Sequence, residues 1–72
     1  MLLPNKLFSY TQSVFSKLPA FLESLDTPLS VEELYQAMQD QIHGPLEFMD
    51  VLDCLYALSK IDIDDKGKIF KC

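Results

Sequence analysis

Arginine and tryptophan are missing from this sequence, and its basic residues are six lysines against eleven aspartates and glutamates. The formal net charge is −5. Proteins that bind nucleic acids place Lys and Arg against phosphates, and Arg is the residue best suited to contact phosphate or guanine through two parallel hydrogen bonds. The composition therefore disfavours direct binding to a nucleic acid, and equally to an anionic membrane surface.

Histidine, glycine and cysteine are scarce, which removes most motifs of catalysis and metal binding. The single histidine, His43, has no nucleophile or second base spaced to work with it, and we interpret it as a helix C-terminal residue that suits the helix dipole. The two glycines form no phosphate-binding loop, and the two cysteines, Cys54 and Cys72, lack CxxC spacing. We predict no enzyme activity, no cofactor and no metal ion.

Long apolar runs are also lacking. No stretch reaches the 18 apolar residues of a membrane span, and the N-terminus lacks the charged region and apolar run of a signal peptide. We therefore expect a cytoplasmic protein that does not bind membranes.

Apolar residues, by contrast, are abundant for so short a chain. Hydrophobic residues make up 49% of the 72 residues. A chain of this length forms one domain with a high ratio of surface to volume, so it cannot bury all of that apolar surface by itself. We expect part of the apolar surface to contact another protein.

Residues 1–8 are predicted to form an N-terminal arm, because Pro4 and Asn5 interrupt a short apolar run that shows no helical period. The arm is too apolar for a solvated tail, so it either packs on the domain or inserts into a neighbour. Its candidate partner-binding residues are Leu2, Leu3, Leu7 and Phe8.

A first helix is predicted over residues 9–25, where apolar residues recur at the spacing of one helical face. These residues are Tyr10, Val14, Phe15, Leu18, Phe21, Leu22 and Leu25. Pro19 removes a hydrogen bond inside this stretch, so it either kinks the helix or begins a second one. The unbroken apolar stripe favours a kink.

Two more helices follow a turn. Ser30 and Glu33 match a capping box, which predicts a helix over residues 31–42. Pro45 suits the first position of the next helix, which is predicted over residues 45–59.

The helix over residues 45–59 is apolar on almost every side, which indicates burial on almost every side. Its carboxylates, Glu47, Asp50 and Asp53, fall on one narrow stripe that we expect to face solvent, so Glu47→Lys is expected to leave the fold intact. Two neighbouring helices can cover only part of the remainder. The uncovered part is a candidate docking surface, assigned to Phe48, Val51 and Leu55.

The C-terminal residues alternate with the period of a strand, and a short turn at Gly67 predicts a β-hairpin over residues 60–72. Asp62, Asp64 and Asp65 lack the bidentate glutamate of a calcium loop, so we interpret them as a solvated turn. Ile69 and Phe70 are the candidate partner-binding residues of this hairpin.

Three helices followed by a hairpin are the element order of a winged helix. We predict a mainly α domain with a small β-hairpin, winged-helix-like, over residues 9–72. In DNA-binding versions the third helix enters the major groove. Here the stripe of Glu47, Asp50 and Asp53 would repel phosphates, which favours a protein partner.

Three stretches of the chain resemble the small middle-component proteins of bacterial ABC-three-component systems. They are residues 3–6 (LPNK), 31–35 (VEELY) and 52–61 (LDCLYALSKI). The resemblance spans nearly the full chain, and its motifs are short and largely structural. In that family a small winged-helix-like protein is encoded between an SMC- or Rad50-like ABC ATPase and an effector, in systems that include Lamassu-type defence against phage and plasmids.

The resemblance implies a non-catalytic bridging subunit. Its partners would be the SMC- or Rad50-like ATPase subunit and a nuclease-like effector subunit, with DNA engaged only indirectly through the complex and no small-molecule substrate. The resemblance carries over no catalytic residue.

Two other classes remain open on the sequence. A winged-helix transcription regulator would need a basic patch, for which only the lysines near the hairpin are available: Lys60, Lys66, Lys68 and Lys71. An acidic antitoxin-like inhibitor would fit the net charge, and it would bind a single toxin instead of an ATPase complex.

Overall fold

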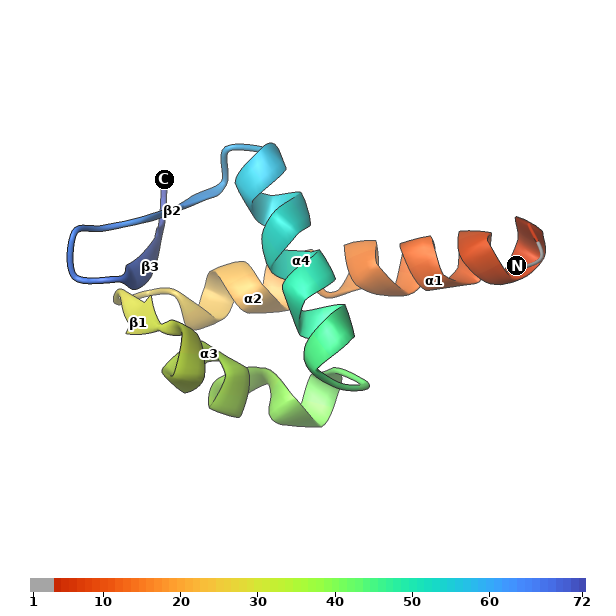
Figure 1. Ribbon diagram of the computed structural model, residues 1–72, viewed down its shortest axis with the longest axis horizontal. Coiled ribbons are helices and arrows are strands. Elements are labelled where there is room, and N and C mark those ends of the chain that lie inside the picture. The colour runs from red at the N-terminus through yellow and green to blue at the C-terminus, as the bar shows by residue number, and fades with distance from the viewer. Residues whose placement is uncertain (1–3) are drawn as a thin grey trace.

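A computed structural model describes residues 4–72 of the chain, and Figure 1 shows its elements. In chain order they are α1 (Pro4–Ser16), α2 (Leu18–Ser24), β1 (Leu29–Ser30), α3 (Val31–Met38), the 3-10 turn η1 (Gln39–Gln41), α4 (Pro45–Ala57), β2 (Ile61–Ile63) and β3 (Lys68–Lys71). The prediction of a mainly helical domain with a small C-terminal hairpin is confirmed, and the arrangement is compatible with a winged helix.

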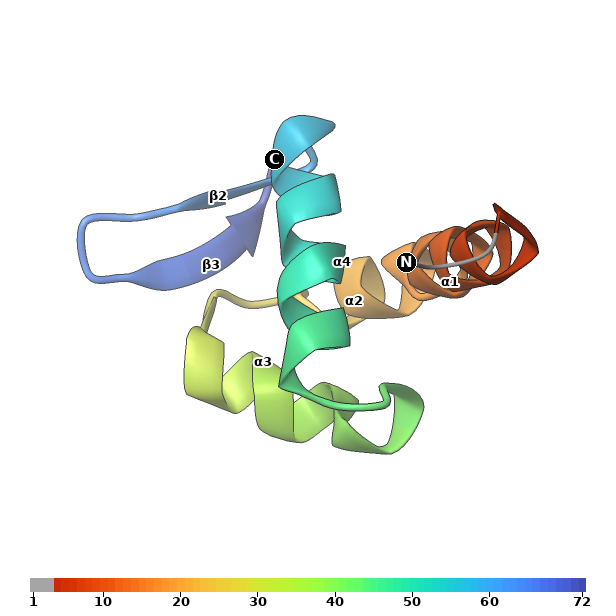
Figure 2. The ribbon, with the colours of Figure 1, turned by 45° about the vertical axis from the view of Figure 1, so that its right-hand side comes forward.

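Helix α1 projects from the rest of the molecule. Figures 1 and 2 show α2, α3 and α4 gathered together, with the β2–β3 hairpin at one end and α1 leaving from the other. The extents of the chain, 40 × 24 × 19 Å, reflect this elongated arrangement. The N-terminal end of α1 therefore projects from the body, whereas Val14 nearer its other end belongs to the core.

The first helix is split at Lys17, so the preferred expectation of one kinked helix is wrong. The Lys17 amide donates to Val14, and the Phe21 amide donates to Lys17, both over 3.1 Å. Pro19 has no amide proton to continue the bonding from Phe15, and it lies in the first turn of α2, where none is needed.

Helix α1 begins at Pro4, earlier than the predicted start at Ser9. Proline suits a first turn of a helix, and this signal for an earlier start was read as an interruption. Residues 4–8, which the sequence placed in an arm, therefore belong to a helix. Leu2 and Leu3 lie outside the described residues.

The capping box at the start of α3 is confirmed. The Glu33 amide donates to Ser30 Oγ over 3.1 Å, and the Ser30 amide donates to Glu33 Oε1 over 2.8 Å. These bonds to Ser30 hold the pKa of the Glu33 carboxyl below its usual value. The helix ends at Met38, short of the predicted end at Ile42, and continues as the η1 turn.

The sheet has one strand more than predicted. Its order is β1-β3-β2, with Leu29 and Ile63 both opposite Ile69 in antiparallel register. Strand β1 has two residues, too few to show an alternating pattern in the sequence. The hairpin prediction itself is confirmed, and Gly67 takes the positive φ of 79° in its turn.

The wing turn uses one of its aspartates for its own backbone. Asp64 Oδ1 accepts hydrogen bonds from the amides of Lys66 and Lys68, over 2.9 and 2.8 Å. This carboxylate therefore stabilises the turn of the hairpin.

The core lies where α2, α3 and α4 meet the sheet, and Phe48 stands near its centre. Its ring is 5.6 Å from Phe21 and 5.0 Å, edge to face, from Tyr35. The side chains that are fully buried or nearly so are Phe21, Leu25, Leu34, Met38, Val51, Leu55 and Ile69. Of the predicted stripe on the first helix, Phe15 is the exception, because its side chain is half exposed.

We expect Ser30→Ala to lower the free energy of unfolding by about 1 kcal/mol, because the amide of Glu33 loses its acceptor at the start of α3. Urea denaturation followed by circular dichroism measures the change. Ser9→Ala, at an exposed position on α1, serves as the matched control and should leave stability nearly unchanged. Equal effects of the two substitutions would contradict the role of the capping box.

Candidate functional site

Four of the predicted partner-binding residues are core residues. Phe48 and Ile69 are 2% and 1% exposed, and Val51 and Leu55 are fully buried. Phe48, Val51 and Leu55 lie on the inner side of α4, where Phe48 packs against Phe21 of α2 and Tyr35 of α3. Ile69 lies on β3 and is buried as well. These four side chains belong to the hydrophobic core, and partner contact stays a prediction for them.

The remaining predicted residues lie at the two ends of the chain. Leu7 and Phe8 on α1 are exposed, and Phe70 on β3 is half-buried. Partner contact stays a prediction for these three. Leu2 and Leu3 are outside the described residues.

Helix α1 carries the first of two exposed apolar surfaces. Phe8 and Phe15 are separated by two helical turns and share one side of the helix, with Leu7 beside Phe8. All three side chains are at least half exposed. We call these residues the α1 stripe.

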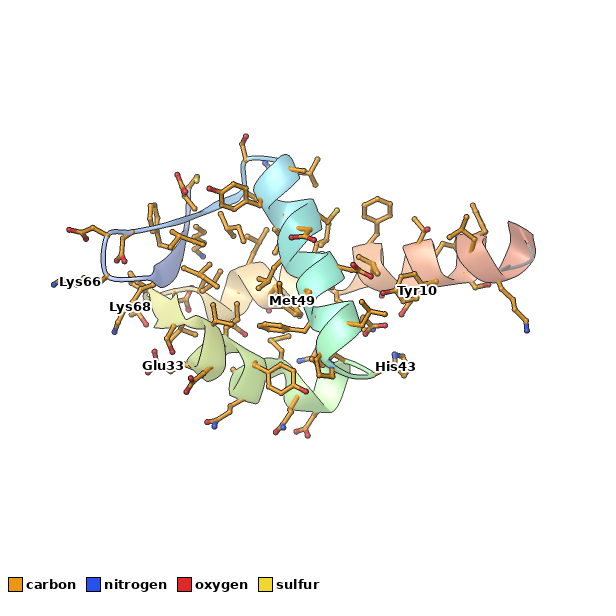
Figure 3. All side chains as sticks on the ribbon, in the orientation of Figure 1. Tyr10, Glu33, His43, Met49, Lys66 and Lys68 are labelled. Carbon is orange, nitrogen blue, oxygen red and sulfur yellow. The ribbon has the colours of Figure 1, made fainter. Side chains whose placement is uncertain are left out.

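A groove between α3, α4 and the wing forms the second apolar surface. One hollow of about 400 Å³ lies between α3 and α4, and a second of about 180 Å³ lies between α4 and the hairpin. Val31 and Met49 line both hollows, so the two hollows adjoin, and we call them together the α3–α4 groove. Figure 3 shows Met49 on the side of α4 that faces α3.

This α3–α4 groove is lined almost entirely by apolar atoms. Met49, Tyr56, Val31 and Ile63 are each between 43% and 53% exposed along it. The lining residues are Val31, Glu32, Tyr35, Gln36, Pro45, Phe48, Met49, Leu52, Asp53, Tyr56, Ile61, Ile63 and Ile69.

The predicted acidic stripe on α4 is wrong for Glu47, which is only 4% exposed. Lys17 Nζ lies 3.0 Å from Glu47 Oε1, and His43 Nδ1 lies 3.0 Å from Oε2. The hydroxyl of Ser13 donates to the same carboxylate over 3.3 Å, and so does the His43 amide. The expectation that Glu47→Lys leaves the fold intact is therefore withdrawn, because the substitution would bring a second ammonium group beside Lys17.

The environment of Glu47 favours its charged form. Burial by itself raises the pKa of a carboxyl group, but the hydrogen bonds from His43 and Lys17 outweigh burial and lower the pKa of Glu47 to about 2. His43, interpreted from the sequence as a helix C-terminal residue, instead contacts a carboxylate in the first turn of α4.

Asp50, the next carboxylate of the stripe, is half-buried and accepts a hydrogen bond from the hydroxyl of Tyr10 on α1. This bond is the main reason that the pKa of Tyr10 rises to about 12, and burial and the charges of Asp50 and Glu47 add to it. The contacts of Asp50 and Glu47 fasten α1 to α4. Asp53 alone of the stripe is exposed, as predicted.

No metal-binding group is found among the described residues. Residues 4–72 contain no cluster of three His, Cys, Asp or Glu side chains that could hold a metal. Cys54 and Cys72 are both free thiols. No helix in the part of the chain that the structure describes has the length and apolar character to cross a membrane.

Reasoning from the sequence missed several residues of the two apolar surfaces. Met49 and Tyr56 were recognised as apolar residues of an all-apolar helix, but nothing in their spacing separated the inner face from the outer one. Val31, the first residue of α3, is 43% exposed and was not singled out as a partner-binding residue. Phe15 was assigned to the buried stripe because the break at Lys17 was not foreseen.

A comparison with family models identifies this chain. The model described as ABC-three component (ABC-3C) system Middle Component 7 matches residues 3–70. The chain belongs to this family. Searches of curated proteins and of solved structures each gave no significant match.

The match confirms the resemblance found in the sequence and makes the chain a middle component of an ABC-three-component system. Membership of a multi-component system implies partner proteins. It also gives the exposed apolar surfaces of this Middle Component 7 chain a context, because such surfaces mark sites where proteins associate.

We expect Glu47→Gln to destabilise the Middle Component 7 chain at neutral pH. The folded-state pKa of about 2 lies below the ordinary value of 4.5, so ionised Glu47 stabilises the fold above about pH 4.5, and this contribution is lost as the pH falls toward 2. The loss at pH 7 is on the order of 3 kcal/mol. Urea denaturation at pH 7, 4.5 and 3 measures it.

The difference between the native chain and Glu47→Gln should shrink from pH 4.5 to pH 3. Glu23→Gln is the matched control, because Glu23 is an exposed carboxylate on α2. A difference that stays constant over this pH range would show that Glu47 does not stabilise the fold through its charge.

Proposed function

We propose that this chain is a non-catalytic bridging subunit that holds an SMC- or Rad50-like ABC ATPase and a nuclease-like effector in one complex. The complex would act in the cytoplasm, in a Lamassu-like defence against phage or plasmids. The observation that carries the proposal is the presence of two separate exposed apolar surfaces, the α1 stripe and the α3–α4 groove, on one small chain.

The two surfaces are placed so that two partners can bind together. The α1 stripe lies on the helix that leaves the body, and the groove extends toward the wing at the opposite end (Figure 1). An interface of ordinary size buries about 800 Å² on each partner. Two such interfaces would use about a third of the 5098 Å² of this chain's surface.

The residue types on the two surfaces suit protein partners. Aromatic residues and methionine are enriched at the centres of protein interfaces, where they supply much of the binding energy. Phe8 and Phe15 occupy the α1 stripe, and Met49 and Tyr56 occupy the groove. Each surface therefore has two large side chains able to serve as anchors.

Direct binding to DNA receives less support. Helix α4 holds the position that enters the major groove in DNA-binding winged helices, and its outward residues include Leu46, Met49, Asp53 and Tyr56, none of them cationic. Lys17 is engaged with Glu47, and Lys71 lies 3.3 Å from Asp26. DNA would then reach the complex through another subunit.

We expect Phe8→Asp and Met49→Asp each to remove one partner and keep the other. Each substitution places a carboxylate that would have to lose its bound water when the partner binds. This desolvation costs about 2 kcal/mol or more, which corresponds to a loss of affinity of about thirtyfold. Both positions are exposed, so circular dichroism should show an intact fold. Co-purification with the other two components of the system measures binding.

The controls add the same charge outside the two surfaces. Ser9→Asp lies on α1 on a different side from Phe8 and Phe15, and Gln39→Asp lies in η1 away from the groove lining. Both should retain both partners. If one surface variant lost both partners while folded, or if neither lost any, the bridging role would be wrong.

A further inference from the structure

The α3–α4 groove has the length of a short helical segment. It runs beside α4 from Pro45 to Tyr56, a distance of about 16 Å at the helical rise of 1.5 Å per residue. Three turns of a docked helix occupy that length and present apolar anchors at positions i, i+3 or i+4, and i+7. The groove therefore matches the repeat of one apolar helix face.

The groove walls favour a helix over a strand. Two helices form the larger hollow, and a third helix can place its side chains between theirs. The neighbouring edge strand, β2, has only three residues, Ile61–Ile63, and gives an added strand little to pair with.

The lining is held in place before any partner arrives. Tyr35 packs edge to face on Phe48, with ring centroids 5.0 Å apart. At the other end of the groove, the Tyr56 hydroxyl donates to Asp62 Oδ1 over 3.3 Å. Side chains that are already ordered lose less conformational entropy on binding.

The charges on the groove select the kind of helix. Glu32 on α3 lines the larger hollow and Asp53 on α4 lines the smaller one, and both are exposed. No lysine is among the described residues that line the groove, and neither carboxylate forms an ion pair with a described residue. An approaching cation would find both carboxylates free.

We infer that the α3–α4 groove receives an amphipathic helix of a partner subunit, with lysine or arginine beside its apolar anchors. The inference rests on the proposed bridging function and names the chemistry that one of the two surfaces recognises. The apolar anchors supply most of the affinity, and the flanking cations pair with Glu32 and Asp53 and set orientation and partner choice.

A second copy of this chain is a weaker occupant. Its exposed helix, α1, carries the α1 stripe, but Lys6 is the only charged side chain at its described exposed positions. One cation cannot pair with carboxylates in both hollows of the groove.

Photo-crosslinking in the assembled complex tests the occupant directly. Benzoylphenylalanine replaces Met49 in the full chain, the three components are co-expressed, and mass spectrometry identifies the crosslinked segment. We expect a single helical segment with apolar residues at helical spacing and a net positive charge. The inference would be overturned if the crosslink captured an acidic segment, a strand, α1 of a second copy or DNA. Benzoylphenylalanine at Gln39, outside the groove, controls for chance capture.

Charge variants test the selection. Glu32→Gln combined with Asp53→Asn should weaken binding of the partner that Met49→Asp removes by about tenfold, or about 1.4 kcal/mol, and should reduce its dependence on salt. Isothermal titration calorimetry with that purified partner at low and high salt measures both effects. Glu23→Gln combined with Asp40→Asn changes the net charge equally at exposed sites off the groove and should leave affinity unchanged.

The outcomes separate this inference from the proposed function. If the native chain binds neither component, both fail. If it binds both components, and Met49→Asp removes one while the charge variants bind like the native chain, the bridging role stands and the basic helix is wrong.

Discussion

The buried carboxylate of Glu47 is the interaction on which the arrangement of this domain depends. Lys17 and His43 both contact it, and the contact with Lys17 ties α4 to the junction of α1 and α2. With Glu47 directed inward beside α1, Phe48, Val51 and Leu55 fill the core, and Met49 and Tyr56 are left outside. A carboxylate that is removed from water has to keep its partners, which makes this orientation costly to change.

The small size of the chain explains why so much apolar surface stays exposed. Helices α2, α3 and α4 and the three short strands can enclose one layer of core side chains, centred on Phe48. A projecting helix and the outer face of α4 have no further element to cover them. Under the proposed function, the other subunits of the ABC-three-component system would cover these faces.

The acidic residues serve several separate purposes. Glu33 caps α3, Asp64 stabilises the wing turn, and Glu47 and Asp50 fasten α1. Glu32 and Asp53 remain exposed on the groove. The net charge of −5 is therefore partly structural, and the carboxylates left over lie beside the surface proposed for a partner.

Local signals in the sequence determined the elements of this protein, because each depends on a few neighbouring residues. The capping box at Ser30 placed the start of α3, Pro45 placed the start of α4, and alternation with Gly67 placed the hairpin. The order of helices and hairpin predicted the fold class, and the resemblance of residues 3–6, 31–35 and 52–61 indicated the family. Tertiary structure alone decided which side of α4 is inside, because a helix that is apolar all round has no periodicity to mark its inner face. The packing of Phe48 against Phe21 and Tyr35 and the contact of Glu47 with Lys17 select that face.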